Sequence, residues 1–447
     1  MKIDRSLFHP DYKPEPFWWE AARPGTAHST DLPAATEIFI VGSGYSGLSA
    51  ALELARNGRS VTVVDAMAFG EGASTRNGGG VSAGINLGKG ISGAPGQDAR
   101  GEDHKTLVNS LLRESLAAYE FVGELVAREN IECHFERRGR FVGAYSKAHY
   151  PSLVKKAEFL NEMLQMDATA IPFEAQRSEI GSDFYHGGLA INRAGKIHPA
   201  LFHKGLLDAC HREGVTLCAH TKVNAIEGSV GSFTVKTAKG DCRAEQVIIG
   251  TNGYTGALTP KLRKRIVPIS SQIIVTEELP EDLALELIPN GRTISETPRV
   301  SSYYRLLPGD RRVMYGGRAR FQDVPPDVSA SLLHRMMTDR WPQLKGTKIT
   351  HSWSGFVAMT TDALPHMGQE DGLHFCTGCN GSGVAMMTYL GNQIARRILQ
   401  NGVSNSAYVD LKFPGVPVPC YTGKPWFLPI VGEYYRYLDR KERRAAG

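Results

Sequence analysis

Three glycines near the start of the chain have the spacing of a phosphate-binding turn. Gly42, Gly44 and Gly47 form a G-x-G-x-x-G pattern that follows the apolar run EIFIV and opens a helical pattern. In this context the first glycine makes a tight turn, the second lets the backbone approach a pyrophosphate, and the third lets helix and strand pack closely. Asp65 ends the next apolar run, SVTVVD, where its carboxylate can accept hydrogen bonds from ribose hydroxyls. The spacing predicts a dinucleotide site, with a glycine-rich turn of another α/β protein as the alternative.

A second glycine-rich stretch suits contact with a flat ring. Residues 72–80 read GASTRNGGG, with small side chains, two side-chain donors and three consecutive glycines. Such a loop can lie against a bulky planar group, and a flexible surface loop is the alternative. Glycine makes up 48 of the 447 residues, which is about 11% against a usual share near 7%. The excess gathers in four segments that we expect to meet the dinucleotide: 42–47, 70–96, 250–256 and 378–383.

The alternation of apolar runs and helical patterns predicts a mixed α/β fold in which a Rossmann-like domain carries an inserted domain with a mixed and antiparallel sheet. The chain length corresponds to two or three domains of about 150 residues. Hairpin patterns dominate residues 257–350, and after 351 the chain again resembles its first section. We expect an extended arm packed on the surface (1–35), a discontinuous cofactor domain (36–100, 190–256 and 351–410), a substrate domain (101–189 and 257–350) and a tail (411–447).

Charge, cysteine usage and the chain ends exclude several classes of protein. The net charge is +5 and no long basic run is present, so we expect no nucleic-acid partner. Seven scattered cysteines favour reduced thiols in a cytoplasmic, soluble protein, and the start of the chain lacks the apolar core of a signal peptide. Cys376 and Cys379 have no second pair or histidine cluster beside them, so we expect no metal site. The tail carries aromatic and basic residues that could touch a membrane, although packing on the protein's own surface is the more common outcome.

Four spaced motifs make the chain similar to the D-amino-acid oxidase superfamily of FAD enzymes. They are the glycine fingerprint, the STRNGG loop, VIIGTNGYTG and GCNGSGVA, and the similarity spans about 12–410. Within the superfamily the chain most resembles the gamma-glutamylputrescine oxidase-like branch, in RNGG, in YYRLLPGDRRVMYGGR and in FWWEAA. The resemblance implies an FAD-binding domain of the glutathione-reductase type. It also implies non-covalent FAD, because the loop after the second strand has no histidine for attachment.

The resemblance assigns cofactor roles to individual residues. The fingerprint glycines would hold the pyrophosphate, Asp65 the adenosine ribose, and Arg76 and Asn77 would lie near the polar edge of the flavin. Val223 would contact adenine through its backbone, with an ordinary core residue as the alternative. Ser382 stands where close relatives often have histidine. The full set of cofactor-binding candidates is Gly42, Gly44, Tyr45, Ser46, Gly47, Asp65, Ala66, Ala73, Ser74, Arg76, Asn77, Gly78, Gly79, Val223, Thr251, Asn252, Gly253, Gly381, Ser382, Gly383 and Val384.

A valine stands where amino-acid oxidases of the superfamily place an arginine. In the glycine-oxidase branch an arginine in a G-L-R-P stretch clamps the substrate carboxylate, and Val357 occupies that position in GFVAMTTDALP. This favours an amine whose carboxylate, if it has one, lies away from the reacting carbon. Arg318 could bind such a distal acid, with an ordinary salt bridge as the alternative. Aromatic candidates for the pocket walls, each of which could equally be a core residue, are Tyr303, Tyr304, Trp353 and Phe356.

The resemblance implies oxidation of a primary or secondary amine by hydride transfer to flavin N5, followed by hydrolysis of the imine and reduction of O2 to H2O2. No histidine or carboxylate stands out as a general base, and none is needed if the amine binds in its neutral form. One alternative is a dehydrogenase that passes electrons to a quinone or another carrier. A second alternative is an FAD-binding protein without catalysis. The sequence leaves the identity of the amine and the oligomeric state open.

Overall fold

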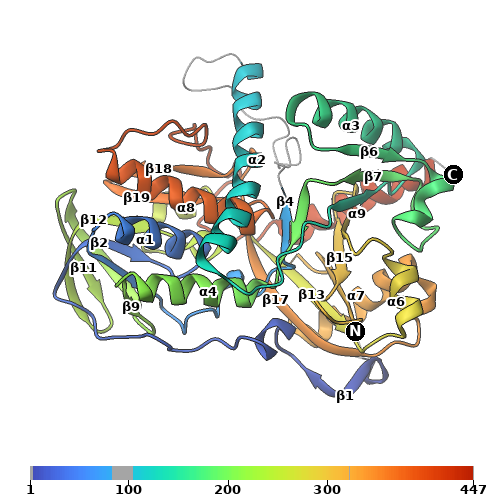
Figure 1. Ribbon diagram of the computed structural model, residues 1–447, viewed down its shortest axis with the longest axis horizontal. Helices are drawn as coiled ribbons and strands as arrows, with labels where there is room; N and C mark the ends of the chain where they lie inside the picture. The colour runs from blue at the N-terminus through green and yellow to red at the C-terminus, as the bar shows by residue number, and fades with distance from the viewer. Residues whose placement is uncertain (1–3, 83–103, 322, 446–447) are drawn as a thin grey trace.

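A computed structural model describes residues 4–82, 104–321 and 323–445 (Figure 1). The described residues form two large sheets with helices packed around them, so the predicted mixed α/β class is confirmed. The helices are α1 (Tyr45–Arg56), α2 (His104–Glu129), α3 (Tyr150–Leu164), α4 (Pro199–Arg212), α5 (Pro260–Arg263), α6 (Glu281–Leu287), α7 (Pro326–Arg340), α8 (Gly383–Leu399) and α9 (Leu428–Ala445). Within these segments, no helix is both long and apolar enough to cross a bilayer.

The first sheet is built around the apolar runs of the fingerprint region. Its path is β10 (Val223–Ser229), β11 (Ser232–Thr237), β12 (Gly240–Ile249), β2 (Ala35–Val41), β3 (Val61–Val64) and β9 (Thr216–Cys218), with β19 (Leu373–Thr377) beside β12 and β18 (His366–Glu370) beside β19. Strands β9, β3, β2, β12 and β19 are parallel to their neighbours in that series. Helices α1, α4 and α8 lie together over one face (Figure 1).

Strand β2 shows why this region reads as a continuous apolar run. Ile38 and Ile40 face the helices, whereas Phe39 and Val41 face a separate core beneath β10–β12. Successive side chains of a strand point to opposite faces, so a strand covered on both sides needs apolar residues at every position. The parallel strands end at one edge of this sheet, where the loops that follow β2 and β3 carry the predicted dinucleotide site.

The second sheet has nine strands in the described residues. Their order is β1 (Phe8–Lys13), β17 (Ile349–Met359), β13 (Val267–Thr276), β16 (Val313–Gly317), β15 (Ser302–Leu306), β14 (Thr293–Glu296), β5 (Arg140–Gly143), β7 (Gly188–Ile191) and β6 (Ala168–Ile171). A separate pair joins β4 (Gly80–Ser82) to β8 (Ala194–Lys196). Helices α6 and α7 pack on the sheet around Tyr304, Tyr315 and Trp341. A buried ion pair joins Glu296 to Arg340, with 2.8 Å between Oε1 and Nη2.

The N-terminal arm, expected to pack on the surface, makes one strand and buries one tryptophan. Strand β1 pairs in parallel with β17 at the edge of the second sheet, and the chain then crosses the molecule to β2 (Figure 1). Trp18, in the short 3-10 turn Phe17–Glu20, is fully buried. The arm therefore places one large side chain in the interior, and its placement as a separate surface segment stays a prediction. Burial of an indole removes a large apolar area from water, which ties the arm to the body of the protein.

Strand β17 also lies in a different sheet from the one that its sequence suggested. Residues 351–410 were grouped with the cofactor domain, but β17 pairs with β13 along its whole length and so belongs to the second sheet. The return to the first sheet begins only at β18 and β19. The rest of the domain division stays a prediction, and residues 83–96 of the long glycine-rich segment lie outside the described residues.

Two buried histidines predict a loss of stability in mild acid. Burial lowers the pKa of His198 and of His374 to about 4, so both rings stay neutral in the folded protein. The unfolded chain, with histidine pKa values near 6.5, binds more protons below that pH. The free energy of unfolding is therefore expected to fall from pH 6.5 towards pH 4, by up to roughly 3 kcal/mol per histidine. Urea unfolding at several pH values measures this, and His374→Gln is expected to flatten the slope; an unchanged slope would contradict the assignment.

Candidate active site

A cavity of about 1130 Å³ lies between the two sheets. Most residues predicted to bind the cofactor line it, in the loops after β2 and β3, the β12 end and the start of α8. Gly47 is not in the wall, because it faces the β2–α1 turn instead. The predicted cofactor residues in the wall are Gly42, Gly44, Tyr45, Ser46, Asp65, Ala66, Ala73, Ser74, Arg76, Asn77, Gly78, Gly79, Val223, Thr251, Asn252, Gly253, Gly381, Ser382, Gly383 and Val384.

The fingerprint turn is tight enough to require glycine. Gly42 has φ +107°, a conformation that residues with a side chain rarely adopt. A Cβ at Gly47 would lie 2.0 Å from the carbonyl oxygen of Gly42, so any side chain there would push α1 off β2. Helix α1 begins after Gly44 without a side-chain cap, and its amide-rich N-terminus borders the cavity. This arrangement fits the pyrophosphate of FAD, since backbone N–H groups and the helix dipole both favour phosphate.

Asp65 is held at the end of β3 by backbone and hydroxyl donors. The N–H and the hydroxyl of Ser43 donate to its Oδ2 at 3.0 and 2.7 Å, and the N–H of Met67 donates to its Oδ1 at 3.0 Å. His203 from α4 lies with its Nε2 2.8 Å from the carbonyl oxygen of Ser43. The carboxylate is thus oriented at the cavity wall, where its remaining lone pairs are suited to ribose hydroxyls.

Three tryptophans hold the loop after β3 in position through hydrogen bonds from their indole N–H groups. The indole N–H groups of Trp18 and Trp353 donate to the carbonyl oxygens of Asn77 (2.9 Å) and Arg76 (2.8 Å). Trp19 donates to the hydroxyl of Thr75 at 2.9 Å. Two of these tryptophans come from the N-terminal arm and one from β17. The loop is therefore preset by distant parts of the chain.

Arg305 completes this support from the second sheet. It is 1% exposed, and its Nη1 donates to the carbonyl oxygens of Ile197 (2.9 Å), Gly79 (3.2 Å) and Gly78 (3.4 Å). Burial lowers its pKa to about 9. The sequence interpretation assigned no role to Trp18 or to Arg305, although the motifs that contain them, FWWEAA and YYRLLPGDRRVMYGGR, contributed to the family resemblance. The aromatic pair in FWWEAA was the available signal for Trp18.

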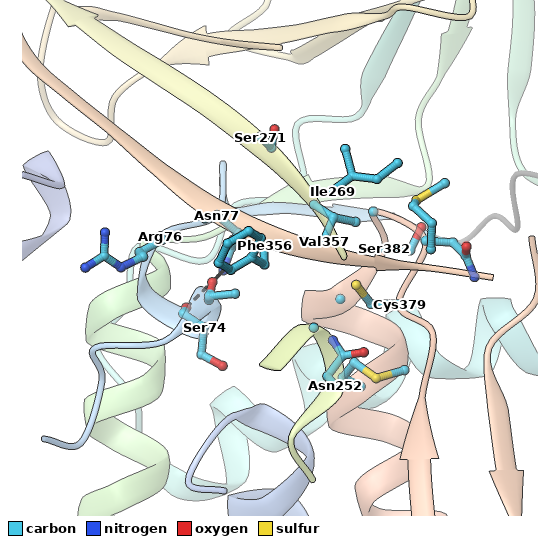
Figure 2. A pocket seen from close by; sticks show the side chains of 18 of the residues that line it. Ser74, Arg76, Asn77, Asn252, Ile269, Ser271, Phe356, Val357, Cys379 and Ser382 are labelled. Carbon is cyan, nitrogen blue, oxygen red and sulfur yellow. Dashed lines mark hydrogen bonds between the residues drawn. The ribbon is translucent and has the colours of Figure 1, made fainter. Parts of the chain in front are cut away.

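Arg76 and Asn77 shape the loop with their side chains. The Asn77 amide donates to the carbonyl oxygen of Ser74 at 2.9 Å, and its Oδ1 accepts from the N–H of Gly79 at 2.8 Å. The Arg76 guanidinium lies 4.5 Å from the Trp19 ring centroid and points away from the cavity centre (Figure 2). Both residues border the cavity, but their polar groups are largely engaged by protein.

Removing the Trp18 N–H is expected to weaken FAD binding. In Trp18→Phe the half-buried carbonyl of Asn77 loses its partner, which costs about 1–3 kcal/mol if the loop is to keep its position. The dissociation constant of FAD, measured by titration of apoprotein, is expected to rise at least about tenfold. Trp426→Phe alters a 60% exposed tryptophan and serves as the control. Equal affinities in the two variants would show that the arm does not preset the loop.

The start of α8 forms another wall of the cavity. Asn252 accepts the N–H of Gly378 on its Oδ1 at 3.1 Å, which joins the β12 end to the turn before α8. A residue that sequence interpretation missed, Gly391, lets α8 cross α1, because a Cβ there would lie 2.2 Å from the carbonyl oxygen of Ser46. The helix N-terminus at Gly383 favours negative charge at the cavity wall.

The other side of the cavity is made by the second sheet. Figure 2 shows Ile269 and Ser271 on β13 and Phe356 and Val357 on β17, across from Asn252 and Cys379. Tyr303 lies beside them and its hydroxyl is 2.9 Å from Ser271 Oγ.

Two predicted wall residues lie differently. Tyr304 borders the cavity but is 1% exposed, and its ring stacks on Tyr315 in the core. Trp353 is outside the cavity wall, because its ring is buried beside Trp18 and its N–H is directed at the loop.

Two arginines face this cavity without an acidic partner among the described residues. Arg318, after β16, is half-buried, and its Nη2 lies 3.8 Å from the sulfur of Met359. Arg140 on β5 donates from Nε and Nη2 to Ser295 Oγ at 2.9 and 2.7 Å. Burial lowers the pKa of both guanidinium groups from the ordinary value, but leaves them charged at neutral pH. A cation removed from water without a partner is costly, so this side of the cavity is suited to an anionic group.

The acids in the wall are already engaged. Glu296 is paired with Arg340, and Glu442 is paired with Arg299 at 2.7 Å. Asp65, at the end of β3, accepts hydrogen bonds from Ser43 and Met67. The lining residues that the structure describes therefore offer no unpaired carboxylate beside Ile269 and Val357 to act as a base.

Comparisons with known proteins agree with this geometry. Residues 37–397 match the family described as "DAO: FAD dependent oxidoreductase". The gamma-glutamylputrescine oxidoreductase of Escherichia coli K12 is 32% identical over 412 residues, which cover 90% of this chain and 93% of that protein. A glycine oxidase of Bacillus licheniformis is 22% identical, over 82% of this chain and 94% of its own.

Solved structures show the same fold. The glycine oxidase of Geobacillus kaustophilus superposes with a TM-score of 0.68 at 17% identity, covering 84% of this chain and 97% of that one. The L-proline dehydrogenase of P. horikoshii gives a TM-score of 0.67 at 18% identity, with 89% and 98% covered. The family match and the Escherichia coli relative confirm the resemblance inferred from the motifs and set aside a non-catalytic role. The chain belongs to the DAO family and is an FAD-dependent oxidoreductase that acts on amine or amino-acid donors.

Proposed function

We propose that this protein oxidises a primary or secondary amine whose acidic group lies away from the reacting carbon, with O2 as the electron acceptor. The observation that carries the proposal is the pair of residues facing the cavity: Val357 is apolar, and Arg318 is a cation without an acidic partner among the described residues. An α-amino acid would need a cation close to the reacting carbon. A distal carboxylate would instead be held by Arg318, and the planar guanidinium is suited to bidentate pairing.

The protein's part in this reaction is to bind, orient and desolvate the amine. When bound, FAD supplies the chemistry by accepting a hydride from the carbon attached to nitrogen. Loss of that hydride and of one nitrogen-bound proton forms a C=N bond, which water hydrolyses to a carbonyl compound and an amine or ammonia. O2 takes the two electrons and two protons and becomes H2O2. The apolar and aromatic wall of Ile269, Phe356 and Val357 favours the neutral amine, so no general base is required.

A similar protein supports a substrate of this kind. The Escherichia coli relative is named a gamma-glutamylputrescine oxidoreductase. We propose that γ-glutamyl amines or related amines with a remote carboxylate are the substrate class here. Arg140, further along the second sheet at β5, is a second cation that could hold another anionic or polar group of an elongated substrate.

An anaerobic screen tests this assignment. Holoenzyme is mixed without oxygen with γ-glutamyl amines, polyamines, N-methyl amino acids and D-amino acids. Reduction of the bound flavin is followed as bleaching of its visible absorbance. We expect the amines with a remote carboxylate to bleach fastest. Rapid bleaching by simple D-amino acids would contradict the role given to Val357.

The acceptor is tested separately by measuring peroxide. One H2O2 per amine consumed in air supports the oxidase. A dehydrogenase would bleach equally fast without oxygen but recover its colour slowly in air and quickly with a quinone, and that outcome would replace O2 with a carrier.

We also propose that FAD is held non-covalently. Ser74, Tyr45 and Asp65 surround the cofactor end of the cavity with hydrogen-bonding groups, and Cys379 is a thiol in the wall. Acid precipitation is expected to leave the yellow colour in the supernatant. Colour retained in the pellet of the parent protein, and lost from the pellet of Cys379→Ser, would instead identify a thioether link.

A further inference from the structure

The last helix, α9, carries an exposed apolar stripe on one face. Ile430, Tyr434 and Tyr437 recur at the spacing of neighbours on a helix surface and are 69%, 58% and 55% exposed. Trp426, just before the helix, is 60% exposed. Isolated exposed apolar side chains are ordinary, but four large ones within twelve residues form a patch of the kind that marks an interaction surface.

Basic side chains flank this stripe. Lys424, Arg440, Lys441 and Arg444 are exposed, and the described part of the chain offers none of them an ion pair. The exposed acid on the same helix, Glu433, is paired with Arg436. The surface is therefore apolar along its centre and positively charged around it.

The opposite face of α9 is fastened to the body of the protein. Asp439 is buried and accepts the N–H groups of Arg299 and Val300 at 3.1 and 3.0 Å. The carboxylate of Glu442 accepts hydrogen bonds from both Nη atoms of Arg299, at 2.8 and 2.7 Å. A Cβ at Gly432 would lie 2.3 Å from the Phe321 ring, which shows how closely the helix approaches. The stripe is thus a fixed feature of the folded surface.

We propose that α9 docks in the headgroup region of an anionic phospholipid bilayer, with Trp426, Ile430, Tyr434 and Tyr437 at the depth where headgroups meet acyl chains. Tryptophan and tyrosine favour this boundary because their rings have an apolar body and a polar tip. Helices that lie in this plane combine such residues with lysine and arginine, which are attracted to anionic lipid.

The positive charge around α9 favours an anionic lipid surface over a second copy of the chain as its partner. A two-fold dimer would bring the same positively charged patch of each copy against the other, and like charges oppose that contact. Lysine is also depleted in the cores of protein interfaces. Anionic lipid complements all four cations at once.

Docking through α9 would place the cavity beside the bilayer. Leu428, Val431 and Tyr435 on the inner side of the same helix line the cavity wall. The proposal does not depend on which amine is oxidised, and it extends the reaction by giving it a location at a lipid surface.

Vesicle sedimentation with the full-length holoenzyme tests the proposal. Vesicles of phosphatidylcholine alone are compared with vesicles that contain phosphatidylglycerol, at low and high salt. We expect binding to the anionic vesicles only, and release by salt, because screening weakens the attraction of exposed charges. Absence of binding to either vesicle at millimolar lipid would overturn the proposal.

Two variants separate the apolar and the electrostatic parts. Trp426→Ser with Tyr434→Ser is expected to weaken partitioning at least tenfold, and Lys441→Glu with Arg444→Glu by more than about fivefold per removed cation. Phe173→Ser with Leu285→Ser removes exposed apolar side chains elsewhere and is the matched control. Retained FAD absorbance and an unchanged midpoint of thermal unfolding show that each variant is folded.

Light scattering of the same variants tests whether the stripe is instead an interface with a second copy of the chain. A holoenzyme that is dimeric, and becomes monomeric in Trp426→Ser with Tyr434→Ser, would show that the stripe is an interface between copies. That result, or equal partitioning of all variants, would overturn the bilayer proposal.

Discussion

Arg318→Met is expected to lower kcat/KM for an amine with a remote carboxylate by about 100-fold, mainly through a higher KM. Truncating one partner of a desolvated charge pair costs 2–5 kcal/mol or more, roughly 30- to several-thousand-fold, and about 100-fold lies within that range. The guanidinium has no competing acid among the described residues, so the substrate would supply its ionic partner. Initial rates of peroxide formation with the amine identified in the anaerobic screen measure the effect.

The specificity of this loss distinguishes recognition from structural damage. An amine of similar length without a carboxylate is expected to react at nearly the same rate in parent and variant. Arg320→Met changes an arginine two residues further along, outside the cavity wall, and is expected to leave both rates unchanged. A uniform loss of activity with both amines, or no loss with either, would remove Arg318 from substrate recognition.

Gly47→Ala is expected to abolish assembly of the FAD site. The added Cβ would lie 2.0 Å from the carbonyl oxygen of Gly42 and 3.3 Å from Ile40, so α1 must move off β2. Overpacking costs typically 1–3 kcal/mol where side chains can adjust, and here the nearest obstacle is backbone, so we expect about 3 kcal/mol or more. Urea unfolding and the ratio of flavin to protein absorbance measure the loss of stability and of cofactor.

Gly346→Ala is the matched control, because a Cβ there meets nothing within 4 Å. It is expected to keep full FAD content and the parent's unfolding midpoint. Full FAD content in Gly47→Ala would mean that the turn tolerates a methyl group, and the close-packing role of the third fingerprint glycine would then be wrong.

The cofactor side of the site could be predicted from the sequence because its determinants are local. A strand, a glycine turn and a helix follow one another at 37–58. Each of them can be predicted from the spacing of apolar residues and glycines within its own segment. A backbone conformation such as the positive φ of Gly42 can also be predicted from the sequence, because glycine occupies the position that requires it. The family resemblance then identified the planar group as a flavin.

The contacts that hold the loop after β3 could not be predicted, because the residues that make them are remote from the loop in the chain. Trp18 donates to Asn77 and Trp353 donates to Arg76, contacts that only the finished fold creates. Arg305 stands on a strand whose neighbours give no sign that it binds three carbonyl groups. The sheet to which β17 belongs was missed for a related reason. Its partner β13 is distant in the chain, and the apolar pattern of a strand does not show which distant strand it pairs with.

The pairing of β12 with β19 also sets the order in which the protein can be assembled during translation. Ile248 and Ile249 pair in register with His374 and Phe375, and α8, which begins at Gly383 in the cavity wall, follows β19 in the chain. A nascent chain therefore carries the complete glycine fingerprint long before it can enclose a flavin. Until the last quarter of the chain leaves the ribosome, the apolar edge of β12 lacks its neighbour and is prone to wrong pairing. We therefore expect FAD to bind late in biosynthesis, and truncated chains that end before β19 to be substrates for quality control.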